Sequence, residues 1–157
     1  MFAIIMFIYR DWIYPIFSHL IHTNPLSFHN VEIDVPIEWL VMEQKENSVV
    51  LVKKGAEVSL LVRNYVYDKL NKENISENDL SGIIIDNKNI KVTGYGKINV
   101  HNKNGHYVDL INNSQTSDWK YMRILAIPTA SIQFEFQYYS DKITESDLDI
   151  LKSIVIK

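Results

Sequence analysis

The sequence predicts an α+β fold, in which a mostly antiparallel sheet is flanked by helices and preceded by an apolar N-terminal helix. Three observations favour it. The first 21 residues are almost entirely apolar, apolar and polar residues alternate from residue 31 onward, and helix signals follow Thr144. Alternation with a period of two is typical of half-buried strands. The 157 residues therefore divide into an N-terminal helix (1–21), a connector (22–30) and an α+β domain (31–157).

The N-terminal stretch, MFAIIMFIYRDWIYPIFSHLI, is predicted to be a membrane anchor. A spanning helix needs about 20 mostly apolar residues, and here Arg10 and Asp11 interrupt the run. A secretory signal is not indicated, because a basic start and a small-residue cleavage site are both missing. Aromatic and basic residues gather at membrane–water interfaces, and the candidates for that contact are Tyr9, Arg10, Trp12 and Tyr14. Two alternatives stay open: an amphipathic helix lying in the membrane plane, and a helix packed on the domain or on a partner.

The first half of the domain reads as strands. In VEIDV, residues 31, 33 and 35 face one way, and Pro36 ends the strand because proline cannot donate to a sheet ladder. SVVLVKKGAEVSLLVRN predicts two strands joined at Lys54-Gly55. YDKLNKENISENDLSGIIID contains a polar stretch and a possible short helix, for which Ser76 is a candidate cap.

The second half predicts a hairpin, two longer strands and a closing helix. KINVHNKNGHYVDLI is expected to turn at Asn104-Gly105. WKYMRILAI and SIQFEFQYY follow, and in the latter the glutamines and Glu135 are expected on a wet face. Thr144 is the predicted N-cap of the last helix, with Asp147 returning the bond. The apolar stripe that should pack on the sheet is Leu148, Leu151 and Ile154.

Two segments carry a family resemblance. NVEIDVPIEW, with Pro36 followed by Trp39, resembles the first strand of PsbP-like and DcrB-like domains. SIQFEFQYYSDKITESDLDILKSIVI resembles the same group's ending, and YMRILAIP its penultimate strand. The resemblance covers residues 29–157 and departs from the family between residues 66 and 90, where the family has a longer helix. It implies an α/β/α sandwich and non-enzymatic roles as assembly factors, adaptors or envelope proteins, and it supplies no site residues.

The residues offer no catalytic, cofactor or metal motif. No cysteine is present, which excludes thiolate chemistry, and no G-x-S-x-G frame holds a serine. His101 and His106 flank the expected turn, but a metal would need a third ligand such as Asp109, so exposed turn histidines are favoured. The glycines of TGYGK open no helix, which argues against a phosphate loop.

Partner contact is the remaining expectation. Aromatic residues are enriched at interface hot spots, and Trp12 and Tyr139 are the candidates, whereas Trp39 and Trp119 are expected in the core. A net charge of −3 and a pI of about 5.9 argue against nucleic-acid binding.

The function expected from these observations is a non-catalytic, membrane-tethered domain that binds or assembles proteins in the bacterial cell envelope, without a cofactor. The domain is expected on the extracytoplasmic side, with another membrane or envelope protein as its partner. One alternative is a soluble, cytoplasmic adaptor, chaperone or immunity-type protein that docks through its N-terminal helix. Another is a small hydrolase or a domain that binds a hydrophobic ligand, which requires a sizeable apolar pocket between sheet and helix.

Overall fold

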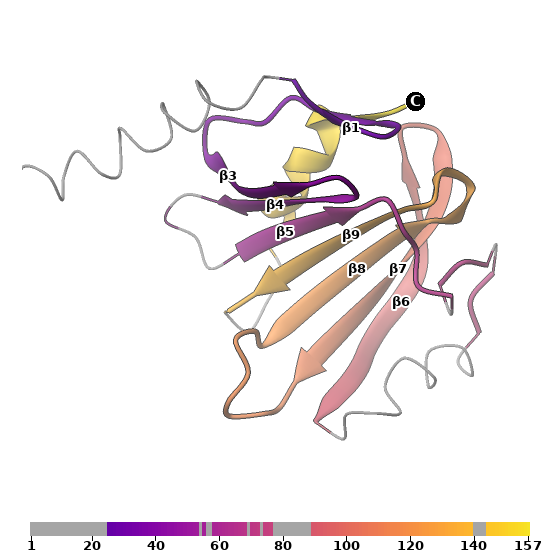
Figure 1. The fold of residues 1–157 in the computed structure, drawn as a ribbon. Coiled ribbons are helices and arrows are strands. Elements are labelled where there is room, and N and C mark those ends of the chain that lie inside the picture. The colour runs from indigo at the N-terminus through magenta and orange to yellow at the C-terminus, as the bar shows by residue number, and fades with distance from the viewer. Residues whose placement is uncertain are drawn as a thin grey trace, which may run out of the picture.

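A computed structural model describes residues 25–53, 55, 58–68, 70–72, 74–76, 89–139 and 144–157. These residues form a mostly β domain with two antiparallel sheets and two 3-10 helices (Figure 1). The predicted α+β class, with helices on both sides of the sheet, is therefore wrong for this part of the chain. The physical reason is that most of the described residues pair in strands, while the described helices are two 3-10 helices.

The larger sheet has the order β3-β4-β5-β9-β8-β7-β6, and the smaller one the order β1-β2-β10. The strands of the larger sheet are β3 (Trp39–Lys45), β4 (Ser48–Lys53), β5 (Val58–Arg63), β6 (Ile90–Val100), β7 (Lys103–Asn112), β8 (Tyr121–Ile127) and β9 (Ile132–Tyr138). The smaller sheet contains β1 (Leu26–Phe28), β2 (Val31–Ile33) and β10 (Ile154–Ile156). The 3-10 helices are η1 (Pro128–Ala130) and η2 (Glu145–Ser153).

The predicted C-terminal helix is present only in part. Residues 145–153 form η2 as a 3-10 helix, and Ile154, which the prediction placed on the helix, begins β10. The change occurs because Ile154 and Ile156 pair with Ile33 and Val31 of β2 and are buried there. The hydroxyl of Thr144 hydrogen-bonds the Asp147 carboxylate rather than a backbone amide. The capping signal thus marks the start of the helix, while a strand partner distant in sequence decides its end.

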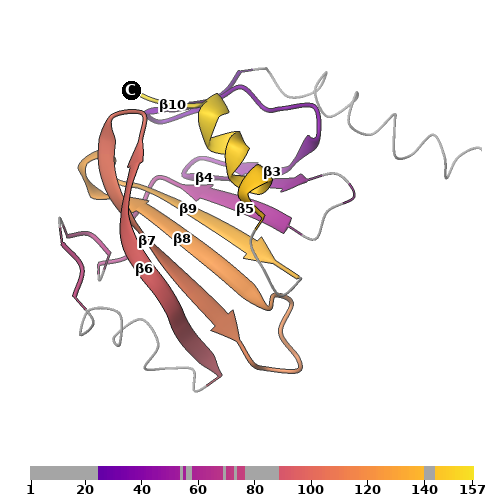
Figure 2. The same ribbon diagram turned by 180° about the vertical axis from the view of Figure 1, so that it is seen from behind.

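One face of the larger sheet, which we call the helix face, packs against η2 and the smaller sheet (Figure 2). Its core includes the predicted alternating residues of β9, and Trp39 is buried here, as expected. The largest fully buried side chains are Trp39, Tyr138, Phe134 and Phe136. Gly55, between β4 and β5, has a positive φ of 63°. The two strands predicted on either side of this glycine are confirmed as β4 and β5.

The opposite face, which we call the far face, is also covered, so the predicted wet face of β9 is wrong. Val66 and Leu70, which follow β5, pack on a second apolar cluster formed by β7 and β8. Gln133 and Glu135 are 0% and 3% exposed. The amide group of Gln133 accepts a hydrogen bond from the Tyr67 N–H (3.1 Å) and donates one to Glu135 (2.8 Å). These polar groups can be buried because they hydrogen-bond to each other and to the segment that follows β5.

The β6–β7 hairpin does not turn where predicted. His101 and Asn102, both with positive φ, form the turn, whereas Asn104 and Gly105 lie within β7. Two left-handed residues match the twist of a hairpin, and the side-chain oxygen of Asn99 accepts the Asn102 N–H at 3.1 Å. The prediction took an Asn-Gly pair as the turn, although this glycine is needed for close contact with β8.

The predicted N-terminal helix (1–21) lies outside the described residues, as does most of the helix suggested near Ser76. Leu26–Phe28, within the predicted connector, form β1 and pair with β2. In the ranges that the structure describes, no helix combines the length and the apolar character needed to cross a membrane.

Candidate functional site

A group of aromatic and charged side chains lies on the helix face, on strands β7 and β8. We call this group the tyrosine–arginine surface, and it consists of Tyr107, Asp109, Tyr121 and Arg123. The antiparallel register places Asp109 opposite Arg123, and alternation brings the two tyrosines to the same face. Helix η2 lies over the β4, β5 and β9 side of the sheet (Figure 2). Both tyrosines and Arg123 remain half-buried rather than buried.

Arg123 is fixed by a two-pronged ion pair with Asp109. Its Nε donates to Oδ1 at 2.6 Å, and its Nη2 donates to Oδ2 at 2.7 Å. Such parallel bonds fix the guanidinium plane as well as its position. The side chains of Arg123 and Asp109 are only 20% and 9% exposed. Hydrogen bonding to Asp109 raises the pKa of Arg123, so the group stays cationic.

Tyr107 stacks on this ion pair, and two glycines of β6 make room for the arrangement. The Arg123 Cζ lies 4.7 Å from the Tyr107 ring centroid, within cation–π range. A Cβ at Gly96 would lie 2.9 Å from Tyr107 Cε1, and one at Gly94 would lie 3.3 Å from Asp109 Oδ2. The glycines of TGYGK therefore serve close packing between β6 and β7.

Tyr121 connects this surface to the buried core. Its ring contacts Tyr138 edge to face, with centroids 6.4 Å apart, and its hydroxyl lies 3.5 Å from Thr93 Oγ1. Tyr138 is 1% exposed, and its hydroxyl has no hydrogen-bond partner in the described structure. Burial, followed by the nearby Asp147 carboxylate, raises the pKa of Tyr138 far above its ordinary value. This hydroxyl is therefore a neutral donor at physiological pH.

Both carboxylates near this surface are already paired. Both Asp109 oxygens bond Arg123, and Asp147 is held by Lys53 at 2.6 Å and by Thr144. The described residues contain no group of three or more side chains that could hold a metal ion. Two of the five guanidinium N–H groups of Arg123 bond Asp109, and the other three can donate to a carbonyl or carboxylate.

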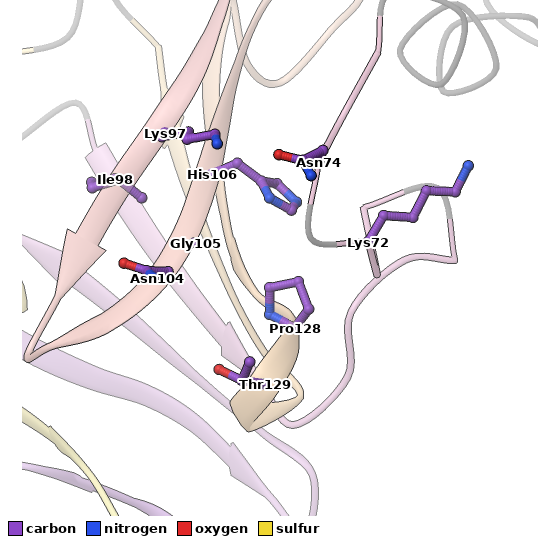
Figure 3. Close-up of a pocket in the computed structure, with 9 residues that line it drawn as sticks. All are labelled: Lys72, Asn74, Lys97, Ile98, Asn104, Gly105, His106, Pro128 and Thr129. Carbon is purple, nitrogen blue, oxygen red and sulfur yellow. The ribbon is translucent and has the colours of Figure 1, made fainter.

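A hollow of about 420 Å³ lies near the turn of the β6–β7 hairpin (Figure 3). Its lining consists of Lys72, Asn74, Lys97, Ile98, Asn104, Gly105, His106, Pro128 and Thr129. The side chains of Asn74 and His106 approach each other, while Lys72 extends away (Figure 3). Two further hollows, each of about 390 Å³, are lined mainly by polar residues. None of these three is the apolar pocket that a hydrophobic ligand would require.

The two hairpin histidines do not meet. His101 Nε2 lies 2.8 Å from the Leu151 carbonyl oxygen, on the helix side. His106 is buried on the far face, and its Nε2 lies 2.7 Å from the Leu70 carbonyl oxygen. Asp109, the third ligand considered for a metal, faces the opposite side and pairs with Arg123. His106 is thus a structural contact to the covering segment, not the exposed turn residue that the sequence predicted.

The burial of His106 predicts a pH-dependent stability. Burial lowers the pKa of His106 below the ordinary value of about 6.5. The His106 side chain therefore binds a proton more readily in the unfolded chain than in the folded one. The free energy of unfolding is accordingly unaffected by this histidine above about pH 6.5 and declines as the pH falls below that value. Urea unfolding between pH 7.5 and 5 should show a smaller decline in a His106→Gln variant than in the wild type. Equal declines in the two proteins would contradict this assignment.

Of the two aromatic residues predicted to contact a partner, only Tyr139 is among the described residues, and it lies apart from this surface. Tyr139 is 49% exposed but follows Tyr138 on the opposite side of the strand, and Trp12 lies outside the described residues. Trp119 is half-buried against the far-face cluster. Sequence reasoning missed the tyrosine–arginine surface. The available signal was that Asp109 and Arg123 occur in phase with large apolar residues of their strands, Ile111 and Leu125.

Among known proteins, similarity to this chain is found in solved structures. No family model and no curated protein matches the chain. Among solved structures, the solution structure of cyanobacterial PsbP (CyanoP) from Synechocystis sp. PCC 6803 is similar, with a TM-score of 0.44 and 10% identity. The match covers 82% of this chain and 87% of that one. That protein belongs to the group that the sequence resembles, and at this TM-score and identity the match carries no argument.

Proposed function

We propose that this chain is a non-catalytic protein-binding domain of the bacterial cell envelope, held at a membrane by its N-terminal segment, and that it contacts its partner through the tyrosine–arginine surface. One observation carries the proposal. Arg123 is fixed by Asp109 against the Tyr107 ring, close to a second half-buried tyrosine. The surface lies on paired strands, so it is formed before any partner arrives.

The composition and rigidity of this surface favour a protein partner. Arginine and tyrosine are enriched among the residues that dominate protein–protein binding energies. Ordering flexible side chains on association costs about 0.5–1.5 kcal/mol each. Arg123 avoids much of that cost because its two bonds to Asp109 already order it.

The tether rests on the amino-acid sequence of residues 1–21. The apolar run before Arg10 and the aromatic residues around it are typical of a segment that enters a membrane and stops at its interface. An envelope partner follows from that location, and we place the domain on the extracytoplasmic side.

Membrane fractionation of the full-length chain tests the tether. The wild type is expected to remain in carbonate-washed membranes, while a variant carrying Ile5→Asp and Ile8→Asp is expected in the soluble fraction. Both proteins in the soluble fraction would overturn the tether and favour an adaptor that docks through its N-terminal segment.

Site-specific photo-crosslinking in the native cell tests the binding surface. A crosslinker at Ile111, which pairs in register with Tyr121, should give one discrete adduct, while a crosslinker at the exposed Val155 of β10 should not. Tyr121→Ala should abolish the adduct, and the matched Tyr139→Ala should leave it. The reverse pattern for the two tyrosines would place the partner elsewhere.

A further inference from the structure

Strand β6 forms one edge of the larger sheet. It is 11 residues long and pairs with β7, and no described residue pairs with its outer side. Strands in globular proteins usually have about 5–6 residues. An edge strand presents unpaired N–H and C=O groups that can accept another strand. The length of β6 makes it a large surface of this kind.

This edge is basic in a chain that is acidic overall. Residues 89–105 contain Lys91, Lys97 and Lys103 and no aspartate or glutamate, although the whole chain has a net charge of −3. Lys91 and Lys97 are exposed. An incoming strand that carries carboxylates would therefore be attracted to this edge, because opposite charges on neighbouring strands stabilise their pairing.

A second copy of this chain is the less suitable occupant. Pairing of two β6 strands would bring together two edges that each carry Lys91 and Lys97 and no carboxylate. Like charges placed directly opposite destabilise a strand pair, and edge lysines are a common device against self-pairing. The same lysines that oppose a second copy attract an acidic segment.

The β6 edge lies next to the tyrosine–arginine surface, because β6 pairs with β7. On the helix face, β6 presents Gly94 and Gly96, which have no side chains to separate an added strand from Tyr107 and Asp109 of β7. Neighbouring strands lie about 4.8 Å apart, so a long side chain of an added strand could cross the glycines to the Tyr107 ring. On the far face, Lys97 pairs in register with His106 and lines the polar hollow (Figure 3).

We propose that β6 accepts an extended, acidic segment of the partner protein as an additional strand of the sheet. This inference rests on the proposed protein-binding function and specifies how the partner engages. Backbone hydrogen bonds along β6 supply affinity that does not depend on the partner's side chains, as in other cases of strand addition. Carboxylates opposite Lys91 and Lys97, and side chains that reach Tyr107, supply the specificity.

Amide NMR of the full-length chain with synthetic peptides tests the proposal. The probe is a capped nine-residue peptide of threonine and glutamate whose glutamates fall on both faces of the extended strand, and its control has lysine in place of each glutamate. The glutamate peptide should shift the amide signals of β6 and slow their hydrogen exchange, whereas the lysine peptide should not. Shifts confined to β3, the opposite edge, or signals of β6 that broaden with protein concentration alone, would overturn the proposal.

Charge-reversal variants complete the test. Lys91→Glu with Lys97→Glu should weaken binding of the glutamate peptide at least tenfold and give measurable binding of the lysine peptide. The matched pair Lys45→Glu with Lys152→Glu, also exposed, should leave both affinities unchanged. If the Ile111 adduct depends on Tyr121 but not on Lys91 and Lys97, strand addition is wrong and the binding surface stands. If the glutamate peptide binds β6 while Tyr121→Ala leaves the adduct intact, the proposed surface fails instead.

Discussion

Replacing Arg123 with methionine is expected to lower the free energy of unfolding by about 3 kcal/mol. The substitution leaves the Asp109 carboxylate largely buried without the two hydrogen bonds that now hold it. Breaking a fully buried ion pair costs about 3–5 kcal/mol, and the partial exposure of Arg123 places the expected loss at the lower end. Urea unfolding of the two proteins measures the difference.

A double substitution separates the lost pair from lost packing. Asp109→Leu together with Arg123→Met removes both charges, and replacing a buried pair by apolar residues of similar volume is often close to neutral. The double variant should therefore be more stable than Arg123→Met alone, which gives a coupling energy from the thermodynamic cycle. As a matched control, Lys152→Met breaks the exposed pair with Asp149 and should cost under about 0.5 kcal/mol. If Arg123→Met and Lys152→Met lower the free energy of unfolding equally, the Asp109–Arg123 pair stabilises the domain no more than an exposed ion pair does.

The strands of this domain could be predicted because alternation is a local property. β4, β5 and β9 lie where the period of two placed them, and Gly55 stands between the first two, as expected. The same local signal cannot tell whether a polar face is wet. Gln133 and Glu135 are buried because the segment around Tyr67 crosses them, and that segment has no period of its own.

The C-terminal segment shows the same division between local and distant causes. Thr144 and the residues after it start a helix, as their chemistry predicts. The helix stops at Ser153 because Ile154 pairs with Ile33, a strand more than a hundred residues earlier. No pattern within the last fourteen residues contains that partner.

For the tyrosine–arginine surface, the sequence could indicate the individual charged residues within strands but not that they pair. In the sequence, Asp109 and Arg123 each stand between apolar residues of a predicted strand, which marks each as a charge in need of a partner. That they are partners of each other follows from the register between β7 and β8. A register shift of one residue would send the two side chains to opposite faces.

Gly105→Ala is expected to destabilise the domain by about 3 kcal/mol. The Asn104-Gly105 pair resembles a turn signal, but in the structure this glycine lies within β7. A Cβ at this position would lie 2.4 Å from the Ala126 carbonyl oxygen and 3.2 Å from Ile127 Cγ1. The first contact is with the backbone of β8, so no side chain can move aside to relieve it. The strands β7 and β8 would have to separate where His106 pairs with Ala126.

Gly55→Ala is the matched control because it isolates backbone conformation from space. Gly55 has a φ of 63° with nothing within 4 Å of the added Cβ, whereas Gly105 is not among the residues with positive φ. A left-handed alanine costs roughly 1–2 kcal/mol, so Gly105→Ala should be the more harmful of the two in urea unfolding. Hydrogen exchange should also quicken first at the amides shared by β7 and β8. If Gly105→Ala costs no more than Gly55→Ala, the close approach of the two strands does not explain why glycine occupies this position.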